Sequence, residues 1–200
     1  DADIDAALPF LVNAGIQNAG QTCSASSRIL VQRGVYDQVV ARMAERYSAL
    51  RAGPALSDLS VGPLVSARQK EIVEGFIAKG ADLNLVARGQ VVTDAPAGGA
   101  YVAPALFADV PADHTLAQDE IFGPVLVVIP FKTEEEAVAL ANDNIYGLAG
   151  SVWTSNVSRS IRVAKRLEGG TIWINAHDIV DSAMPFGGVK ASGFGKDLGP

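Results

Sequence analysis

Hydrophobic positions recur with two periods along the chain, and the two kinds of segment alternate from end to end. Apolar residues three and four positions apart predict helices, and unbroken apolar runs predict strands. The expected helices cover residues 35–51, 66–79 and 156–167. The expected strands cover residues 28–32, 83–87, 125–129, 148–154 and 171–175. This alternation predicts an α/β fold, with a mostly parallel sheet flanked by helices, in a single domain over 1–200.

Two further helices are indicated by their N-terminal residues. Three aspartates within the first five residues favour a helix start, and we expect this helix to run to about Ala19, with Pro9 limiting how early it begins. Thr133 and Glu136 form a capping box, which predicts a helix through Asn142. We expect a Pro-, Gly- and Ala-rich loop after residue 87.

Composition excludes several classes of function. The net charge of −6 provides no basic face for nucleic acid. The longest apolar run, residues 125–131, is far shorter than the roughly 20 residues that cross a bilayer. One cysteine and two histidines make neither a disulfide nor a zinc site, so we expect no metal and a cytoplasmic protein. Because the chain starts at Asp1 without Met and ends on Gly199 and Pro200, we expect a piece of a longer protein.

The glycine-dense stretch 185–196 is a candidate for phosphate binding, but it matches neither common motif. A Walker loop requires Ser or Thr after the lysine, whereas Asp197 follows Lys196. A dinucleotide fingerprint fails because its last glycine is replaced by Leu198. We therefore predict a turn-rich loop whose glycines adopt positive φ.

Cys23 lies among small polar residues between an expected helix and an expected strand. Buried structural cysteines prefer apolar neighbours, whereas small neighbours let a ligand reach the sulfur and let the backbone N–H stabilise an oxyanion. From these residues alone, a nucleophile and an inert cysteine remain equally open. A base for the thiol would have to be His114 or His177, and either one is more often a bystander.

The segment 119–124 places two carboxylates just before the most apolar strand. Ligand sites gather at strand ends in α/β sheets, although Asp119 or Glu120 by itself is compatible with a solvated side chain.

Taken together, four ordered segments resemble the NAD(P)-dependent aldehyde dehydrogenase superfamily over nearly the whole chain. They are Asn-Ala-Gly-Gln-Thr-Cys at 18–23, Glu-Ile-Phe-Gly-Pro-Val at 120–125, Gly-Thr-Ile-Trp-Ile-Asn at 170–175 and the glycine-rich segment 185–195. The resemblance implies that Cys23 attacks the aldehyde carbon, giving a thiohemiacetal whose hydride passes to the nicotinamide and leaves a thioester. It also implies that Glu120 binds the nicotinamide ribose hydroxyls and that Phe122 packs near them. The implied cofactor is NAD or NADP.

The resemblance also implies an aldehyde pocket. Its expected residues are Thr22, Ser24, Asn175, Ala176, His177, Val180 and Phe186. Residues 176–184 contain no arginine for a substrate carboxylate, and Lys190 is expected to face structure or solvent. We therefore expect an uncharged aliphatic or aromatic aldehyde rather than succinate semialdehyde.

The departures from the family pattern concern segments that this chain does not contain. Missing are the Glu-Leu-Gly-Gly-Lys segment with the general-base glutamate, the nucleotide-binding half, the oxyanion-hole asparagine and the final oligomerisation strand. We expect an excised catalytic domain with little oxidation activity by itself, from a homo-oligomeric parent, dimer or tetramer. The alternatives are a CoA-acylating dehydrogenase, a stand-alone cysteine hydrolase using His177, and a non-catalytic fragment.

Overall fold

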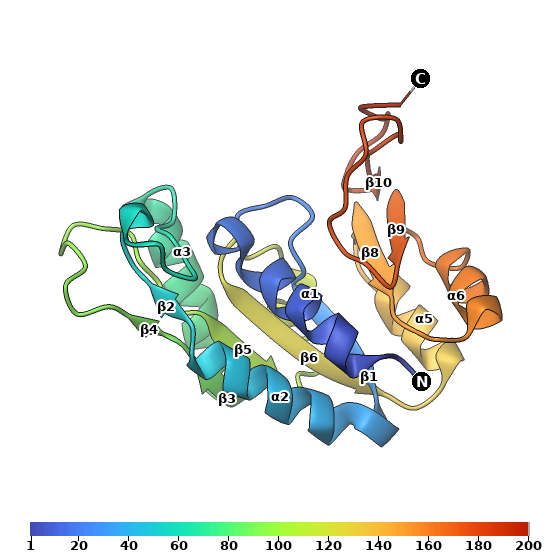
Figure 1. Ribbon diagram of the computed structural model, residues 1–200, viewed down its shortest axis with the longest axis horizontal. Coiled ribbons are helices and arrows are strands. Elements are labelled where there is room, and N and C mark those ends of the chain that lie inside the picture. The colour runs from blue at the N-terminus through green and yellow to red at the C-terminus, as the bar shows by residue number, and fades with distance from the viewer. Residues whose placement is uncertain (200) are drawn as a thin grey trace. The chain divides into compact units, whose positions relative to one another are not determined.

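The computed structural model describes residues 1–199, which form two compact units (Figure 1). One, here called the sheet unit, is Val12–Pro130. The other, here called the C-terminal unit, combines Asp1–Leu11 with the chain from Phe131 onward. The chain passes from one unit to the other within helix α1 and at the end of strand β6. The single-domain organisation expected from the sequence stays a prediction.

A four-stranded mixed sheet is the centre of the sheet unit, with strand order β1-β6-β5-β3. Its strands are β1 (Arg28–Gln32), β3 (Asn84–Arg88), β5 (Ala105–Ala108) and β6 (Val125–Phe131). Strand β6 runs parallel to β5, which is antiparallel to β3. The side chains of residues 125–129 and all of β5 are buried, as expected for central strands covered on both faces.

Helices cover this sheet and account for the α/β class predicted from the sequence (Figure 1). Helix α2 (Tyr36–Ser48) contacts β1, β5 and β3 through a buried face that includes Met43 and Tyr47. Helix α3 (Ala67–Lys79) begins at Ser66, whose side chain accepts a hydrogen bond from the N–H of Gln69. The short helix α4 (Thr115–Gln118) contacts α3.

The C-terminal unit is built on two parallel strands, β8 (Ala149–Val152) and β9 (Thr171–Ile174). Helix α6 (Val157–Ala164) packs on both strands. Helix α5 (Glu134–Asn142) begins as predicted, with the Thr133 side chain accepting from the N–H of Glu136. Two-residue strands β7 (Tyr146–Gly147) and β10 (Val189–Lys190) pair antiparallel.

Several expected boundaries are wrong. Helix α1 (Ile4–Ile16) begins five residues before Pro9, since the Asp3 side chain accepts a hydrogen bond from the Ala6 N–H in its first turn. It ends three residues before Ala19, where a 3-10 turn follows at Gln17–Gly20. The helix expected over 35–51 ends at Ser48. The short strand β2 (Arg51–Ala52) then pairs with β4 (Gln90–Val91), inside the stretch expected to be a loop. Strand β5 and helix α4 were not predicted at all.

No helix among residues 1–199 is long and apolar enough to cross a membrane. Over the same residues, no three His, Cys, Asp or Glu side chains gather in a way that could hold a metal ion.

Candidate active site

Residues 18–23, here called the cysteine turn, have an unusual backbone. Asn18, Ala19 and Gly20 adopt φ values of 50°, 57° and 74°, so three consecutive residues are left-handed. Only glycine occupies this region freely, and each non-glycine residue there costs roughly 1–2 kcal/mol. Such strain persists only where surrounding contacts enforce it, and it gathers at functional sites.

Side-chain amides enforce the conformation of the cysteine turn. Asn18 Nδ2 donates to the Gln21 carbonyl, and Gln21 Nε2 donates back to the Asn18 carbonyl, both at 3.0 Å. Gln21 Oε1 in turn accepts the backbone N–H of Val65 at 2.8 Å. The turn is thereby tied to the segment that leads into α3.

Cys23 is exposed at the end of this turn. Thr22 beside it is half-buried and its carbonyl accepts from the Ala25 N–H at 2.9 Å, while Ser24 is buried. Within the described part of the chain, the backbone N–H of Cys23 donates to no backbone carbonyl. The sulfur is therefore open to a ligand, as the sequence pattern indicates, and its neighbours are small.

Residues 120–123, here called the carboxylate turn, present the two expected cofactor-binding side chains. Glu120 is exposed, and Phe122 is 39% exposed with a left-handed φ of 53°. Gly20 and Gly123 bring the two turns together, because a Cβ on Gly20 would overlap the Gly123 carbonyl. The structure thus places the turn of Cys23 directly against the turn of Glu120 and Phe122.

An open pocket of about 530 Å³ lies beside both turns. Its lining residues are Asn18, Gln21, Pro63, Leu64, Val65 and Phe122. Part of an aromatic ring, apolar side chains and amides line it, and an exposed carboxylate, Glu120, lies two residues before Phe122. A ring with an attached sugar requires this combination of apolar and polar groups.

The histidines are held in structural contacts. His114 Nδ1 accepts the Leu116 N–H at 3.1 Å and caps α4. His177 is buried, with its ring centroid 5.0 Å from that of Trp173. His177 belongs to the C-terminal unit and Cys23 to the sheet unit. Their pairing as base and nucleophile stays a hypothesis.

The remaining expected pocket residues lie in the C-terminal unit and differ in exposure. Asn175 follows β9 with φ 51°, and its amide exchanges two hydrogen bonds with the Thr154 backbone. Ala176 is half-buried and Val180 is exposed. Phe186 is half-buried and pairs through its backbone with Asp197.

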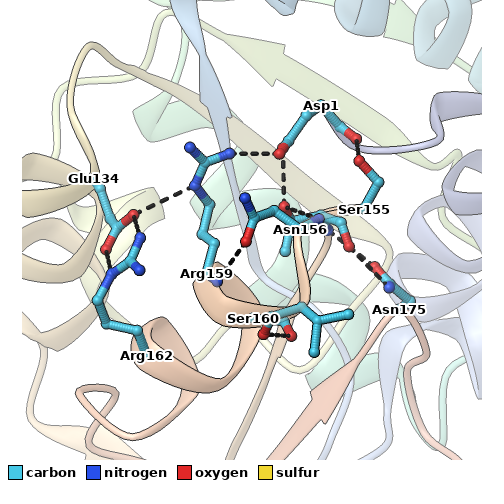
Figure 2. A network of polar contacts seen from close by, with 10 residues as sticks. Asp1, Glu134, Ser155, Asn156, Arg159, Ser160, Arg162 and Asn175 are labelled. Atoms are coloured by element: carbon cyan, nitrogen blue, oxygen red, sulfur yellow. Dashed lines mark hydrogen bonds and ion pairs between the residues drawn. The ribbon is translucent and has the colours of Figure 1, made fainter.

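A polar network holds the beginning of this unit against α6 (Figure 2). The Asp1 carboxylate accepts from Thr154 Oγ1 at 2.9 Å and from Arg159 at 2.5 Å. Arg162 forms a two-point ion pair with Glu134, with both N···O distances 2.7 Å. The Arg162 guanidinium holds the pKa of the Glu134 carboxyl below its usual value. The network is structural: it joins three chain segments.

The glycine-rich stretch 185–196 consists mostly of turns and irregular backbone, and Gly193 and Gly195 adopt positive φ as predicted. Gly187 and Gly188 do not adopt positive φ, and Val189–Lys190 form β10, so that part of the prediction is wrong. Lys190 Nζ donates to the carbonyls of Asn142 and Asn144, at the end of α5. Lys190 therefore faces structure, which confirms that expectation.

Sequence reasoning missed three polar side chains that shape the two turns: Gln69, Gln21 and Asn18. Gln69 Nε2 donates to the carbonyls of Ile121 and Phe122 at 3.1 and 3.0 Å. One signal was present, since Gln69 is one helical turn before the buried Val73 and so lies on the inward face of α3.

Comparison with known proteins identifies the family. The family model described as "Aldehyde dehydrogenase family" matches residues 1–200. The chain belongs to the aldehyde dehydrogenase family. It is 43% identical to a betaine aldehyde dehydrogenase of Cereibacter sphaeroides, over 100% of this chain and 41% of that protein.

Solved structures of aldehyde dehydrogenases have the same fold. A Mycobacterium tuberculosis aldehyde dehydrogenase complexed with NAD+ is 46% identical, with a TM-score of 0.94, over 100% of this chain and 42% of that one. A betaine aldehyde dehydrogenase mutant of Staphylococcus aureus, in complex with NAD+ and carrying a BME-modified cysteine, is 35% identical with a TM-score of 0.93, over 100% and 41%. The chain spans about two fifths of the length of these relatives.

Proposed function

We propose that the complete gene product carrying this chain oxidises an aldehyde to a carboxylic acid with NAD(P)+, using Cys23 as the nucleophile. One observation carries the proposal: the single cysteine is exposed at a strained turn that packs, through Gly20, on the turn presenting Glu120 and Phe122. Membership of the aldehyde dehydrogenase family supports it. A nucleophile and a cofactor-binding turn on one scaffold suit covalent aldehyde oxidation.

The chemistry assigned to this chain begins at the sulfur. The Cys23 thiolate adds to the carbonyl carbon, forming a C–S bond, and the carbonyl oxygen becomes the oxyanion of a thiohemiacetal. The backbone N–H of Cys23 donates to that oxyanion, which stabilises the charge as it develops. The small neighbours Thr22 and Ser24 leave room for the aldehyde.

The carboxylate turn fits the nicotinamide end of a dinucleotide. The Glu120 carboxylate would accept hydrogen bonds from the ribose hydroxyls, and the Phe122 ring would provide an apolar face beside the open pocket. NAD(P)+ held there would accept the hydride that leaves the thiohemiacetal carbon, and the acyl group would remain on Cys23 as a thioester. Relatives with this fold have been solved in complex with NAD+.

Water resolves the Cys23 thioester in the proposed reaction, giving free acid. A CoA-acylating enzyme would instead transfer the acyl group to the CoA thiol. Product analysis with and without CoA separates the two: free acid in both reactions supports the proposal, and acyl-CoA formation overturns this part of it.

We propose an uncharged aliphatic or aromatic aldehyde as substrate. Exposed apolar side chains at Ile179, Val180 and Met184 suit such a substrate, and residues 176–184 contain no Arg or Lys to pair with a carboxylate. We expect a higher kcat/KM for hexanal or phenylacetaldehyde than for succinate semialdehyde. A ratio below one contradicts this choice.

A cationic aldehyde is the second candidate. Asp178 and Asp181 place two carboxylates in the same loop, and relatives at 40–43% identity are named betaine aldehyde dehydrogenases. Betaine aldehyde belongs in the same substrate panel, run with both NAD+ and NADP+. A kcat/KM for betaine aldehyde at least tenfold above that for hexanal would make this candidate the preferred one.

We propose a cytoplasmic homo-oligomer, dimer or tetramer, as the form of the complete gene product. The single cysteine forms no disulfide within the chain, which fits a reducing compartment. Light scattering on the complete gene product tests the oligomeric state, and a strict monomer contradicts it. We further propose that the 200-residue chain by itself binds NAD+ too weakly for turnover, because Glu120 and Phe122 provide only part of a dinucleotide site.

A further inference from the structure

We propose that Gln69 is a positioning residue for the reaction, an inference that rests on the proposed function. Its amide fixes the shape of the carboxylate turn and, through the contact of Gly123 with Gly20, the placement of the cysteine turn. Gln69 lies on α3 and is remote in sequence from both turns.

The Gln69 side chain starts from a fixed point. Its backbone N–H donates to Ser66 Oγ at 3.1 Å, which places it in the capped first turn of α3. The residue is half-buried, so the long side chain has less freedom than one in water. Its Nε2 amine meets two carbonyl oxygens of successive residues, Ile121 at 3.1 Å and Phe122 at 3.0 Å.

The carboxylate turn requires such a donor. Phe122 adopts the left-handed region without being glycine, which costs free energy that external contacts must offset. Two neighbouring carbonyls that point to one donor repel each other unless hydrogens lie between them. An NH₂ group has two hydrogens, one for each oxygen.

A second residue of α3, Val73, also holds the carboxylate turn in place. Gly123 packs so closely on Val73 that a Cβ on this glycine would overlap the Val73 side chain. Gln69 and Val73 are four residues apart and therefore lie on one face of α3. Together they hold both the carbonyls and the glycine of the carboxylate turn.

The segment 65–69 also reaches the cysteine turn. The Val65 N–H donates to Gln21 Oε1 at 2.8 Å, so the segment 65–69 contacts both turns through hydrogen bonds. A carboxylate turn that loosens from Gln69 moves the Gly123 carbonyl, against which Gly20 is packed. The position of Glu120 relative to Cys23 is then no longer fixed.

Both amine hydrogens of Gln69 are donated to protein carbonyls, so Nε2 acts on the backbone of the carboxylate turn. The positioning role proposed for Gln69 is exerted through Glu120, Phe122 and Cys23.

Three substitutions in the complete gene product test this role. Gln69→Met keeps the length of the side chain and removes the donors; Gln69→Glu puts a carboxylate against two carbonyls; Gln69→Lys restores a donor. We expect KM for NAD+ to rise roughly tenfold in Gln69→Met and further in Gln69→Glu, with a smaller change in kcat, and to return close to wild type in Gln69→Lys. Glu71→Gln, at an exposed position of α3, is the matched control and should leave both constants unchanged.

Two measurements without cofactor accompany the kinetics. Hydrogen exchange at residues 121–124 should accelerate in Gln69→Met and Gln69→Glu but not in Gln69→Lys, and the alkylation rate of Cys23 should change in the same order. Folded Gln69→Met with wild-type exchange and wild-type KM overturns the inference. If Gln69→Met does not fold, Gln69→Lys carries the test: a wild-type KM supports the inference and a raised KM overturns it.

Failure of the proposed function is distinguishable. A wild-type gene product that binds no NAD+ overturns the proposed function, and this inference with it. If the wild-type product binds NAD+ and a folded Gln69→Met variant binds it equally tightly, this inference alone is overturned.

Discussion

Asn175 and Thr154 exchange two hydrogen bonds where β9 and β8 end. The Thr154 N–H donates to Asn175 Oδ1 at 2.9 Å, and Asn175 Nδ2 donates to the Thr154 carbonyl at 3.0 Å. The side-chain amide of Asn175 thus serves as a backbone partner for the neighbouring strand. It fixes the point from which the loop carrying His177 and Val180 departs.

Substitution of Asn175 should therefore cost stability. Asn175→Ala removes both hydrogen bonds and leaves a residue that disfavours φ 51°, so we expect a loss of about 2 kcal/mol in the free energy of unfolding. Denaturant unfolding measures it, with Asn13→Ala at an exposed helical position as the control. An unchanged midpoint in Asn175→Ala would contradict the structural role.

Gly20→Ala should disrupt the contact between the two turns. The new Cβ overlaps the Gly123 carbonyl, and the φ of 74° is unfavourable for alanine, so we expect about 2–4 kcal/mol of destabilisation. Gly75→Ala is the matched control, because a Cβ there meets nothing within 4 Å and the position is helical. That variant should gain about 0.5–1 kcal/mol. Equal stabilities of the two variants in denaturant unfolding would refute the close approach of Gly20 and Gly123.

Tyr47 should make stability depend on pH in the alkaline range. Complete burial raises the pKa of its phenol above the ordinary value near 10. Above about pH 10 the unfolded chain loses this proton and the folded chain retains it, so stability falls with rising pH by up to about 1.4 kcal/mol per unit. The contribution is complete below the unfolded pKa and is lost progressively as the pH rises from the unfolded toward the folded pKa.

Tyr47→Phe should reduce this slope by about one proton. Unfolding free energies measured from pH 8 to 11 give the slope, and Tyr146→Phe, at an exposed position, serves as the control. Identical slopes in wild type and Tyr47→Phe mean that the phenol is not held neutral in the fold.

Local signals allowed much of the fold to be predicted. Strand β1 is observed at the predicted residues, 28–32, and the Thr133 capping box starts α5, because both depend on neighbouring residues alone. Strand β5 has only four residues and no alternation. Its conformation depends on pairing with β6 and β3, which lie far away in sequence. Pro9 lies inside α1, so this local helix-breaking signal did not determine where the helix begins.

In the candidate site, too, some residues could be predicted from the sequence and others could not. Cys23, Glu120 and Phe122 were predictable because their segments carry recognisable residue patterns. Gln69 was not predictable, because its partners are the backbone carbonyls of residues 121 and 122. Every residue has such a carbonyl, so residue types do not indicate which one accepts a hydrogen bond. The left-handed Asn18 and Ala19 were equally hidden, since neither residue type requires that conformation.

The most direct test of the account is the activity of Cys23→Ala in the complete gene product, followed as aldehyde-dependent formation of NADH or NADPH. We predict a fall in kcat of at least about a thousandfold, because the sulfur forms the covalent intermediate. NAD+ affinity should persist, since Glu120 and Phe122 are unchanged, and Ser27→Ala, an exposed position after the cysteine turn, should retain wild-type activity. Wild-type turnover by Cys23→Ala would contradict the account.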